Sequence, residues 1–183
     1  AARYGVGIRE PVTIRLAPQP AERPPPPPLG GSTLAVMLWS LKLRYWAFAN
    51  DTFEGPEPDV QMFVVYYDPQ QHDRLRHSLG IQKGLIGVVN AFAARAQTQT
   101  NNVVIAHEFL HTLGASDKYH PASNQPLYPI GYAEPQRTPL HPQRRAEIMG
   151  GRIPLSEQRA EMPDSLEQCL IGPETALEIR WTD

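Results

Sequence analysis

The chain has 183 residues, of which 41% are hydrophobic and 20% charged, as in an ordinary globular protein. Its formal net charge of -2 is not that of a basic protein, so we expect no nucleic-acid partner. We expect no membrane span within the chain, because its longest apolar run, residues 34–48, is shorter than ~20 residues and includes Lys42 and Arg44. The single cysteine, Cys169, excludes an internal disulfide framework, and we expect a small apolar residue there rather than a nucleophile.

The N-terminal part of the chain combines one strand-like pattern with a proline-rich segment. Residues 12–16 alternate apolar with polar side chains, which predicts a half-buried strand. Residues 18–31 predict a proline-rich loop, and its five consecutive prolines at 24–28 favour extended polyproline structure. Such a segment is either a stiff surface loop, which we favour, or a ligand for an SH3-type partner domain.

A helix is predicted next, over residues 34–49. Ser32 and Thr33 precede it and are residues that commonly cap a helix. Four apolar side chains recur in it at helical spacing, and we expect them to form its core-facing side: Leu38, Leu41, Tyr45 and Phe48.

Two strands and a second helix follow. Residues 60–67 are β-branched and aromatic, which predicts a central strand, and residues 84–93 predict another strand despite their two glycines. Asn101 and Asn102 are then positioned to cap a helix over residues 103–113.

The last third of the chain is predicted to be mostly irregular. Residues 120–150 predict a long, proline-rich loop, and a final helix begins after Gly172 and Pro173, because proline suits the first helical position. The order of elements predicts an α/β (α+β) fold in which helices pack against a mixed sheet.

The segment His-Glu-Phe-Leu-His-Thr-Leu-Gly-Ala-Ser-Asp, which begins at His107, is the most informative part of the sequence. His107 and His111 are four residues apart, so a helix directs both imidazoles at one ion, and neutral imidazoles suit Zn²⁺. Glu108 lies roughly 100° round the helix, where its carboxylate can take a proton from a metal-bound water. With six histidines in 183 residues, about 0.01 matches to His-Glu-x-x-His are expected by chance.

The third metal ligand has several candidates. Gly114 can adopt the left-handed conformation that ends a helix, and the turn would bring Asp117 back toward the two histidines. His120 is the nearest competitor, three residues further along the chain. Glu134 and Glu147 are further candidates, but they lie in loop rather than in a clear helix.

These residues resemble the extended zinc signature of the metzincin clan of metallopeptidases. Most metzincins have histidine as the third ligand, whereas the snapalysin-like bacterial enzymes of that clan have aspartate, and this chain resembles them in having Asp117 at that position. Metzincins also have a methionine in a tight turn below the metal, and Met149, in Ile-Met-Gly-Gly, fits this Met-turn. Gly151 stands where some metzincin families have a tyrosine ligand, and no cysteine cluster of the archaemetzincin type follows the signature.

The resemblance implies a fold and a domain organisation. We expect a metzincin-like twisted mixed sheet with an active-site helix, then a loop-rich part with the Met-turn and a final helix. The whole chain, residues 1–183, would be one catalytic domain, with an N-terminal subdomain over residues 1–114 and a C-terminal subdomain over residues 115–183. Because the chain begins with Ala1 rather than methionine, we expect either a processed product or an excised part of a longer protein, with any signal peptide or anchor outside this sequence. A secreted or periplasmic location fits both this start and the clan.

The function implied by the resemblance is zinc-dependent endopeptidase activity on a peptide or protein substrate. Zinc would activate a water, and Glu108 would move its proton to the leaving amine. An extended substrate would pair with an edge strand, for which residues 84–93, or the segment just before them, are candidates. Tyr119 or Tyr132 would be candidates to donate a hydrogen bond to the oxyanion.

Two other functions are compatible with the sequence. In one, zinc stabilises a catalytically silent domain that only binds partners. In the other, the domain is an adaptor that displays its polyproline segment to a partner module.

Overall fold

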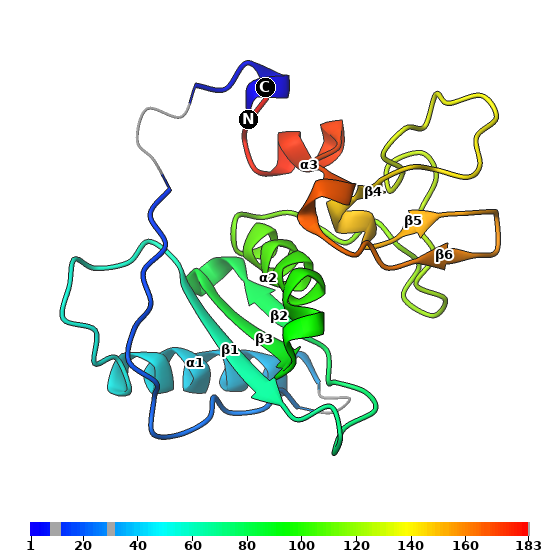
Figure 1. Cartoon of the computed structure of the whole chain (residues 1–183). Helices are drawn as coiled ribbons and strands as arrows, with labels where there is room; N and C mark the ends of the chain where they lie inside the picture. The colour runs from blue at the N-terminus through cyan, green and yellow to red at the C-terminus, as the bar shows by residue number, and fades with distance from the viewer. Residues whose placement is uncertain (8–11, 29–31, 183) are drawn as a thin grey trace.

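A computed structural model describes residues 1–7, 12–28 and 32–182 of the chain. A three-stranded sheet and two long helices form one part of the molecule, and loops with short strands and a short helix form the other (Figure 1). The proline-rich loop predicted over residues 18–31 has neither helix nor strand as far as residue 28, and its last three residues lie outside the described part.

The sheet is mixed, as predicted. Strands β1 (Gln61–Tyr67) and β3 (Ile86–Phe92) are parallel, and β2 (Leu79–Ile81) pairs antiparallel with β3 on its other side. The order β1-β3-β2 makes β3 the central strand of the described sheet, and β3 is also the most buried. The predicted central position of residues 60–67 is therefore wrong, and so is the edge position considered for residues 84–93, whereas the segment before them supplies an edge strand, β2.

Helix α1 (Thr33–Ala49) covers one face of this sheet. Ser32 caps its start, and the Ser32 side chain accepts a hydrogen bond from Ala35 N at 3.4 Å. The extent of α1 agrees with the prediction, but its orientation does not. Its buried residues are Leu43, Trp46 and Ala47, and Trp46 packs edge-on against Phe63 of β1 at 4.9 Å between ring centroids.

The apolar residues predicted to form the core side of α1 are instead exposed. Their exposed fractions run from 56% to 83%, for Leu38, Leu41, Tyr45 and Phe48. The helix is apolar on both sides, so its periodicity fits more than one orientation. No helix within the described ranges has both the length and the apolar character needed to cross a bilayer.

Residues 12–16, predicted as a half-buried strand, form no strand. Val12, Ile14 and Leu16 are 72%, 88% and 95% exposed. Alternation predicts a strand only where a partner strand and a covering layer are present, and here the segment runs over the surface without either.

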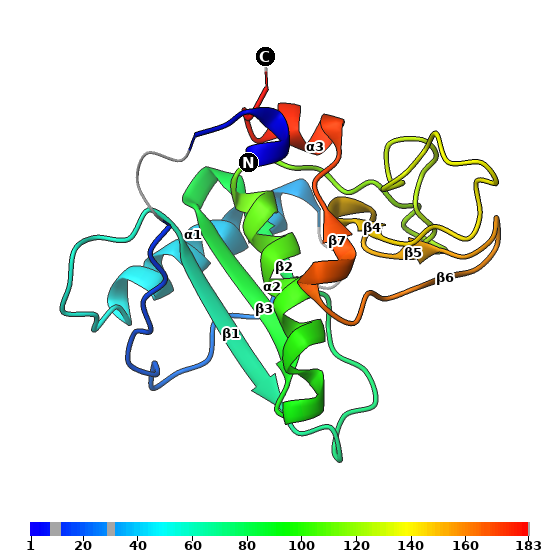
Figure 2. The same cartoon turned by 45° about the horizontal axis from the view of Figure 1, so that its top comes forward.

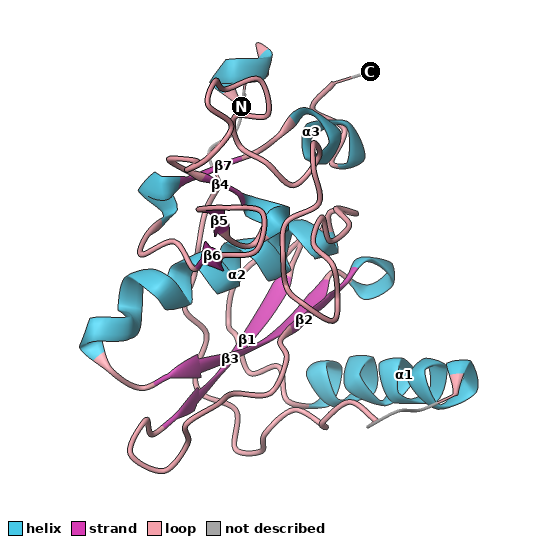
Figure 3. Ribbon diagram, turned by 90° about the vertical axis from the view of Figure 1, so that its right-hand side faces the viewer, coloured by secondary structure: helices cyan, strands magenta, loops and turns pink. Residues whose placement is uncertain are grey.

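Helix α2 (Thr98–Thr112) lies on the opposite face of the sheet from α1 (Figure 3). It begins five residues before the predicted start, so Asn101 and Asn102 are inside the helix and do not cap it. Asn101 is buried and has a different role. Its side-chain amide donates to Phe92 O at 2.9 Å and its carbonyl accepts from Phe92 N at 3.3 Å, which satisfies the backbone at the end of β3.

The C-terminal end of α2 confirms the role predicted for Gly114. Gly114 has φ +107°, and its N–H donates to His111 O at 3.1 Å, while Ala115 N donates to Leu110 O at 3.0 Å. These two bonds are those of a Schellman motif, in which a left-handed residue ends the helix and turns the chain back.

The C-terminal part is mostly irregular, as predicted, and α2 lies between it and the sheet (Figure 2). Its strands are only two residues long and pair as β4 (Ala146–Glu147) with β7 (Cys169–Leu170) and β5 (Ile153–Pro154) with β6 (Ala160–Glu161). The predicted final helix is α3 (Pro173–Glu178), with proline in its first turn. Single 3₁₀ turns occur at Ala2–Tyr4, Gln82–Gly84, Arg95–Gln97, Ile148–Gly150 and Leu166–Gln168.

Gly80 allows β2 to pack directly against α2. A Cβ at this position would lie 2.2 Å from the Glu108 carbonyl oxygen and 2.8 Å from His111 Cβ. We expect Gly80→Ala to push the strand and helix apart and to lower the free energy of unfolding by about 1–3 kcal/mol, measured by urea denaturation. Gly7→Ala is the matched control, because a Cβ there meets no described atom within 4 Å. Equal stability of the two variants would contradict this packing.

Candidate metal centre

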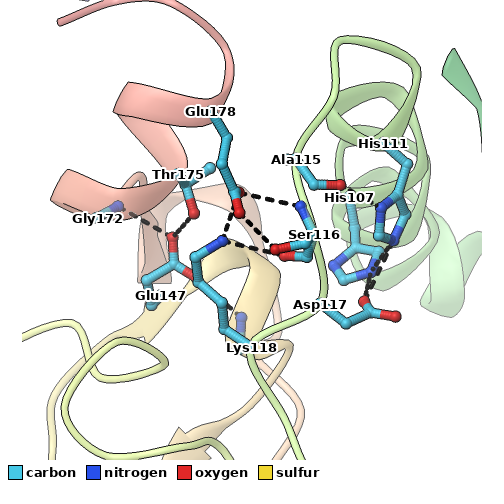
Figure 4. A network of polar contacts seen from close by, with 11 residues as sticks. His107, His111, Ala115, Ser116, Asp117, Lys118, Glu147, Gly172, Thr175 and Glu178 are labelled. Atoms are coloured by element: carbon cyan, nitrogen blue, oxygen red, sulfur yellow. Dashed lines mark hydrogen bonds and ion pairs between the residues drawn. The ribbon is translucent and has the colours of Figure 1, made fainter. Parts of the chain in front are cut away.

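Helix α2 brings the two predicted imidazole ligands together. His107 and His111 lie one turn apart, with 4.8 Å between ring centroids and 3.1 Å between their Nε2 atoms. Figure 4 shows both rings directed at the same point beside the helix. The four-residue spacing therefore has the geometric effect expected from the sequence.

Asp117 completes a group of three candidate ligands. Its Oδ1 lies 3.1 Å from His107 Nε2 and 3.2 Å from His111 Nε2. Ligand atoms about 2.0–2.1 Å from a tetrahedral zinc ion are about 3.3–3.4 Å apart, so the observed triangle fits a zinc ion with little movement. Among the described residues, this is the one cluster of histidine, cysteine, aspartate or glutamate side chains with metal-binding geometry.

Each imidazole is oriented by a backbone carbonyl on the side away from the triangle. His107 Nδ1 is 2.9 Å from Ile148 O, and His111 Nδ1 is 2.7 Å from Ala115 O. A carbonyl oxygen can only accept, so each Nδ1 donates, and in the neutral imidazole the Nε2 lone pair faces the triangle, where it can bind a metal. Outer partners of this kind fix the tautomer and the ring orientation of metal-binding histidines.

The charges in the group favour an ionised carboxylate beside the imidazoles. Burial opposes ionisation of Asp117, but hydrogen bonds with His107 and His111 hold its pKa well below the ordinary value. Burial likewise tends to lower the pKa of His111, yet the bonds to Asp117 and to Ala115 O raise it overall. An ionised carboxylate beside two imidazole Nε2 atoms is an arrangement that favours a bound cation.

Glu108 lies beside the triangle and is 6% exposed. Its Oε2 is buried and has no hydrogen-bond partner among the described residues. Burial raises the pKa of Glu108 and the neighbouring imidazoles His107 and His111 oppose that rise. A buried carboxylate without a partner is costly in a purely structural position, so this side chain is a candidate for chemistry.

Met149 lies in the 3₁₀ turn Ile148–Gly150 and is completely buried. It packs in a core cluster with Leu110 of α2 and with Ala115, and its carbonyl accepts from Lys118 N at 2.9 Å. The turn therefore contacts both the helix that carries the histidines and the segment that carries Asp117.

The competing ligand candidates do not reach the group. His120 Nδ1 accepts from Ala122 N at 3.3 Å, and Glu134 pairs with Arg137 at 3.6 Å. Glu147 is buried, but its two oxygens accept bonds from Gly150 N, Gly172 N and the Thr175 hydroxyl at 2.8–3.0 Å. These residues have other partners, and among the described candidates Asp117 alone joins the two histidines.

Of the two candidate oxyanion donors, Tyr119 lies beside the metal ligands, whereas Tyr132 contacts His141. The Tyr119 ring lies 6.2 Å from that of His107, between centroids, and burial together with the nearby Asp117 carboxylate raises the pKa of Tyr119 to about 12. The Tyr132 hydroxyl is 3.1 Å from His141 Nε2 instead. Cys169 is half-buried, and burial raises its thiol pKa to about 11, which disfavours the thiolate that a nucleophile needs.

Sequence reasoning missed three residues that surround Asp117. Ser116 and Lys118 are its neighbours in the chain, and both bond to Glu178 of α3 (Figure 4). Burial opposes ionisation of Glu178, but the bonds from Lys118 and Ser116 hold its pKa below the ordinary value. In the sequence, Lys118 could have been noticed as a charged residue next to a candidate ligand. Nothing in the sequence around Glu178 indicates its contact with this segment.

Zinc affinity tests the identity of the third ligand. Asp117→Asn removes an anionic ligand, so we expect the dissociation constant for zinc, measured against a chromophoric chelator, to rise by at least about 10–100-fold, the cost typical of losing even an outer partner. His120→Ala is the control and should bind zinc like the wild type. Unchanged affinity in Asp117→Asn, or weakened affinity in His120→Ala, would contradict the assignment.

The same titration has a defined pH dependence. Zinc must displace the proton of His111, whose pKa is raised above 6.5, so affinity falls as pH drops through that raised pKa. Asp117→Asn removes the negative charge that helps to raise the pKa of His111, so the fall in affinity should then occur at lower pH.

Comparisons of the chain with protein-family models, with curated proteins and with solved structures found no match. The geometry and chemistry of the site are therefore the grounds on which a function rests.

Proposed function

We propose that this protein is a zinc-dependent endopeptidase of the metzincin type that hydrolyses peptide or protein substrates. The observation that carries the proposal is the convergence of His107, His111 and Asp117. Beside them lies Glu108, whose buried Oε2 has no hydrogen-bond partner within the described part of the chain. Three protein ligands and one open position are typical of catalytic zinc sites, whereas structural sites use four protein ligands.

Access to the group also favours catalysis. The side chain of Asp117 is 44% exposed, while those of His107 and His111 are 12% and 18% exposed. The histidines are therefore held by the fold, and the triangle is open on the side of the carboxylate. A substrate can approach a metal held there without displacing a protein ligand.

Glu108 would act as the general base. When bound, zinc would polarise the scissile carbonyl and lower the pKa of a coordinated water toward neutrality. Glu108 accepts the proton of the attacking water as the C–O bond forms, and delivers it to the amine nitrogen as the C–N bond breaks. Its burial supports this role, because a raised pKa makes the carboxylate a better proton acceptor.

Strand β2 is the candidate edge for the substrate. It pairs with β3 on one side in the described sheet, and Gly80 lies against the part of α2 that carries Glu108 and His111. An extended peptide bonded to the free edge of β2 would run alongside the metal-binding helix. A secreted or periplasmic location belongs to the same proposal.

The variant Glu108→Gln tests the general base. The amide keeps the size of the side chain but cannot accept the proton, so we expect kcat to fall by about 10²–10⁴-fold with zinc affinity retained. Cleavage of a fluorogenic peptide library measures the activity, and Glu161→Gln, at an exposed position on β6, is the matched control. A kcat of Glu108→Gln equal to that of the wild type would contradict this mechanism.

Removal of zinc distinguishes the enzyme from a catalytically silent, zinc-stabilised domain. The endopeptidase should lose activity reversibly on chelation and keep its circular dichroism spectrum, because protein contacts hold the site together without the ion. The silent domain should unfold on chelation and hydrolyse nothing in either state.

Tyr119 is the candidate donor to the oxyanion. A pKa of about 12 keeps its hydroxyl protonated at neutral pH. Tyr119→Phe should lower kcat by about 10²–10³-fold, as the loss of one oxyanion donor does elsewhere, and leave zinc binding intact. Tyr132→Phe should change neither quantity. Similar kcat values for the two variants would remove Tyr119 from the mechanism.

A further inference from the structure

Asp117 lies between two residues that are held by one carboxylate (Figure 4). Glu178, the last residue of α3, accepts bonds from Ser116 N at 3.0 Å and from the Ser116 hydroxyl. Lys118 Nζ donates to the same carboxylate at 2.6 Å. The chain on both sides of Asp117 is therefore fixed to a helix about 60 residues away in the sequence.

Lys118 strengthens this attachment because its side chain is only 2% exposed. A buried ammonium group is costly unless its charge is paired and its hydrogens are bonded. Its Nζ donates to Glu178 and to Ser116 O at 3.1 Å, and its backbone N–H donates to Met149 O at 2.9 Å. Lys118 is thus held by its side chain and its backbone, which restricts the neighbouring Asp117.

The other end of α3 is attached to the turn that contains Met149. Glu147 Oε1 accepts from Gly172 N and the Thr175 hydroxyl at the start of α3, and its Oε2 accepts from Gly150 N. The same turn supplies Ile148 O, the partner of His107 Nδ1. Helix α3 therefore joins the turn that orients one ligand to the segment that carries another.

We propose that Glu178 is a positioning residue that sets the zinc affinity of the site by holding the segment of Asp117 in its ligating position. The inference rests on the proposed zinc site and adds a determinant of its affinity on α3. Because the segment is already ordered, zinc binding does not include the free-energy cost of ordering it. Loss of this attachment leaves the two imidazoles in place and lets the carboxylate move away.

The test is the variant Glu178→Gln in the full chain. Glutamine has the same size but leaves the charge of Lys118 without a counterion, so the attachment weakens. We expect the zinc dissociation constant, from chelator competition, to rise by about 10–100-fold. The visible absorption of Co²⁺ bound in place of zinc should change as well, because it reports the loss of a fixed carboxylate ligand. Glu174→Gln, at an exposed position on the same helix, should match the wild type in both.

A double variant, Lys118→Met with Glu178→Gln, covers the case in which the single variant does not fold. It removes the buried charge and should fold, yet it still lacks the attachment and should bind zinc as weakly as the single variant. Thermal unfolding of the metal-free proteins measures stability separately from affinity.

The outcomes separate this inference from the proposed function. Wild-type affinity in the folded single or double variant would overturn the inference alone. A lower unfolding temperature with unchanged affinity and unchanged Co²⁺ absorption would show a purely structural role and would also overturn it. Failure of the wild type to bind zinc would overturn the proposed function, and this inference with it.

Discussion

The chain reverses direction at Gly114, and the geometry of the candidate metal centre depends on that reversal. A helix alone can direct His107 and His111 at one ion, but its next turns would carry Asp117 about 9 Å further along the axis. With Gly114 at φ +107°, two Schellman bonds end α2 and return the chain past its own last turn. A Cβ at Gly114 would lie 2.6 Å from Gln82 Nε2, the end of a flexible side chain that can move away, so the backbone conformation is what favours glycine.

The reversed segment is then held by contacts that do not require a metal. His111 Nδ1 bonds to Ala115 O, His107 Nδ1 bonds to Ile148 O, and Glu178 holds the residues on both sides of Asp117. These contacts connect α2 to the turn that contains Met149, and Glu147 connects this turn to the start of α3. Glu178 at the end of α3 then contacts the residues on both sides of Asp117. A site ordered in this way costs little to organise on binding. Beside it, Glu108 Oε2 is buried without a hydrogen-bond partner among the residues that the structure describes, and the proposed chemistry assigns a proton transfer to this side chain.

The parts of the structure that could be predicted from the sequence are those set by local rules. Helix spacing predicted that the two histidines lie together, and Gly114 predicted the turn. The β-branched and aromatic run at residues 60–67 located β1, and the strand predicted over residues 84–93 located β3. The orientation of α1 was mispredicted because the helix is apolar on two sides, and Trp46 rather than Tyr45 faces the sheet. The strand predicted at residues 12–16 failed because alternation does not supply a partner strand. The role of Glu178 was beyond sequence patterns, since no local rule joins it to Ser116 and Lys118.

A crystal structure of the zinc-loaded protein, with anomalous scattering recorded at the zinc absorption edge, tests the central claim most directly. The account predicts one zinc ion bound by His107 Nε2, His111 Nε2 and an Asp117 oxygen, with a solvent or substrate ligand in the fourth position and the Glu178 contacts intact. Zinc bound through His120, a fourth protein ligand that closes the site, or no zinc between the two histidines would contradict it.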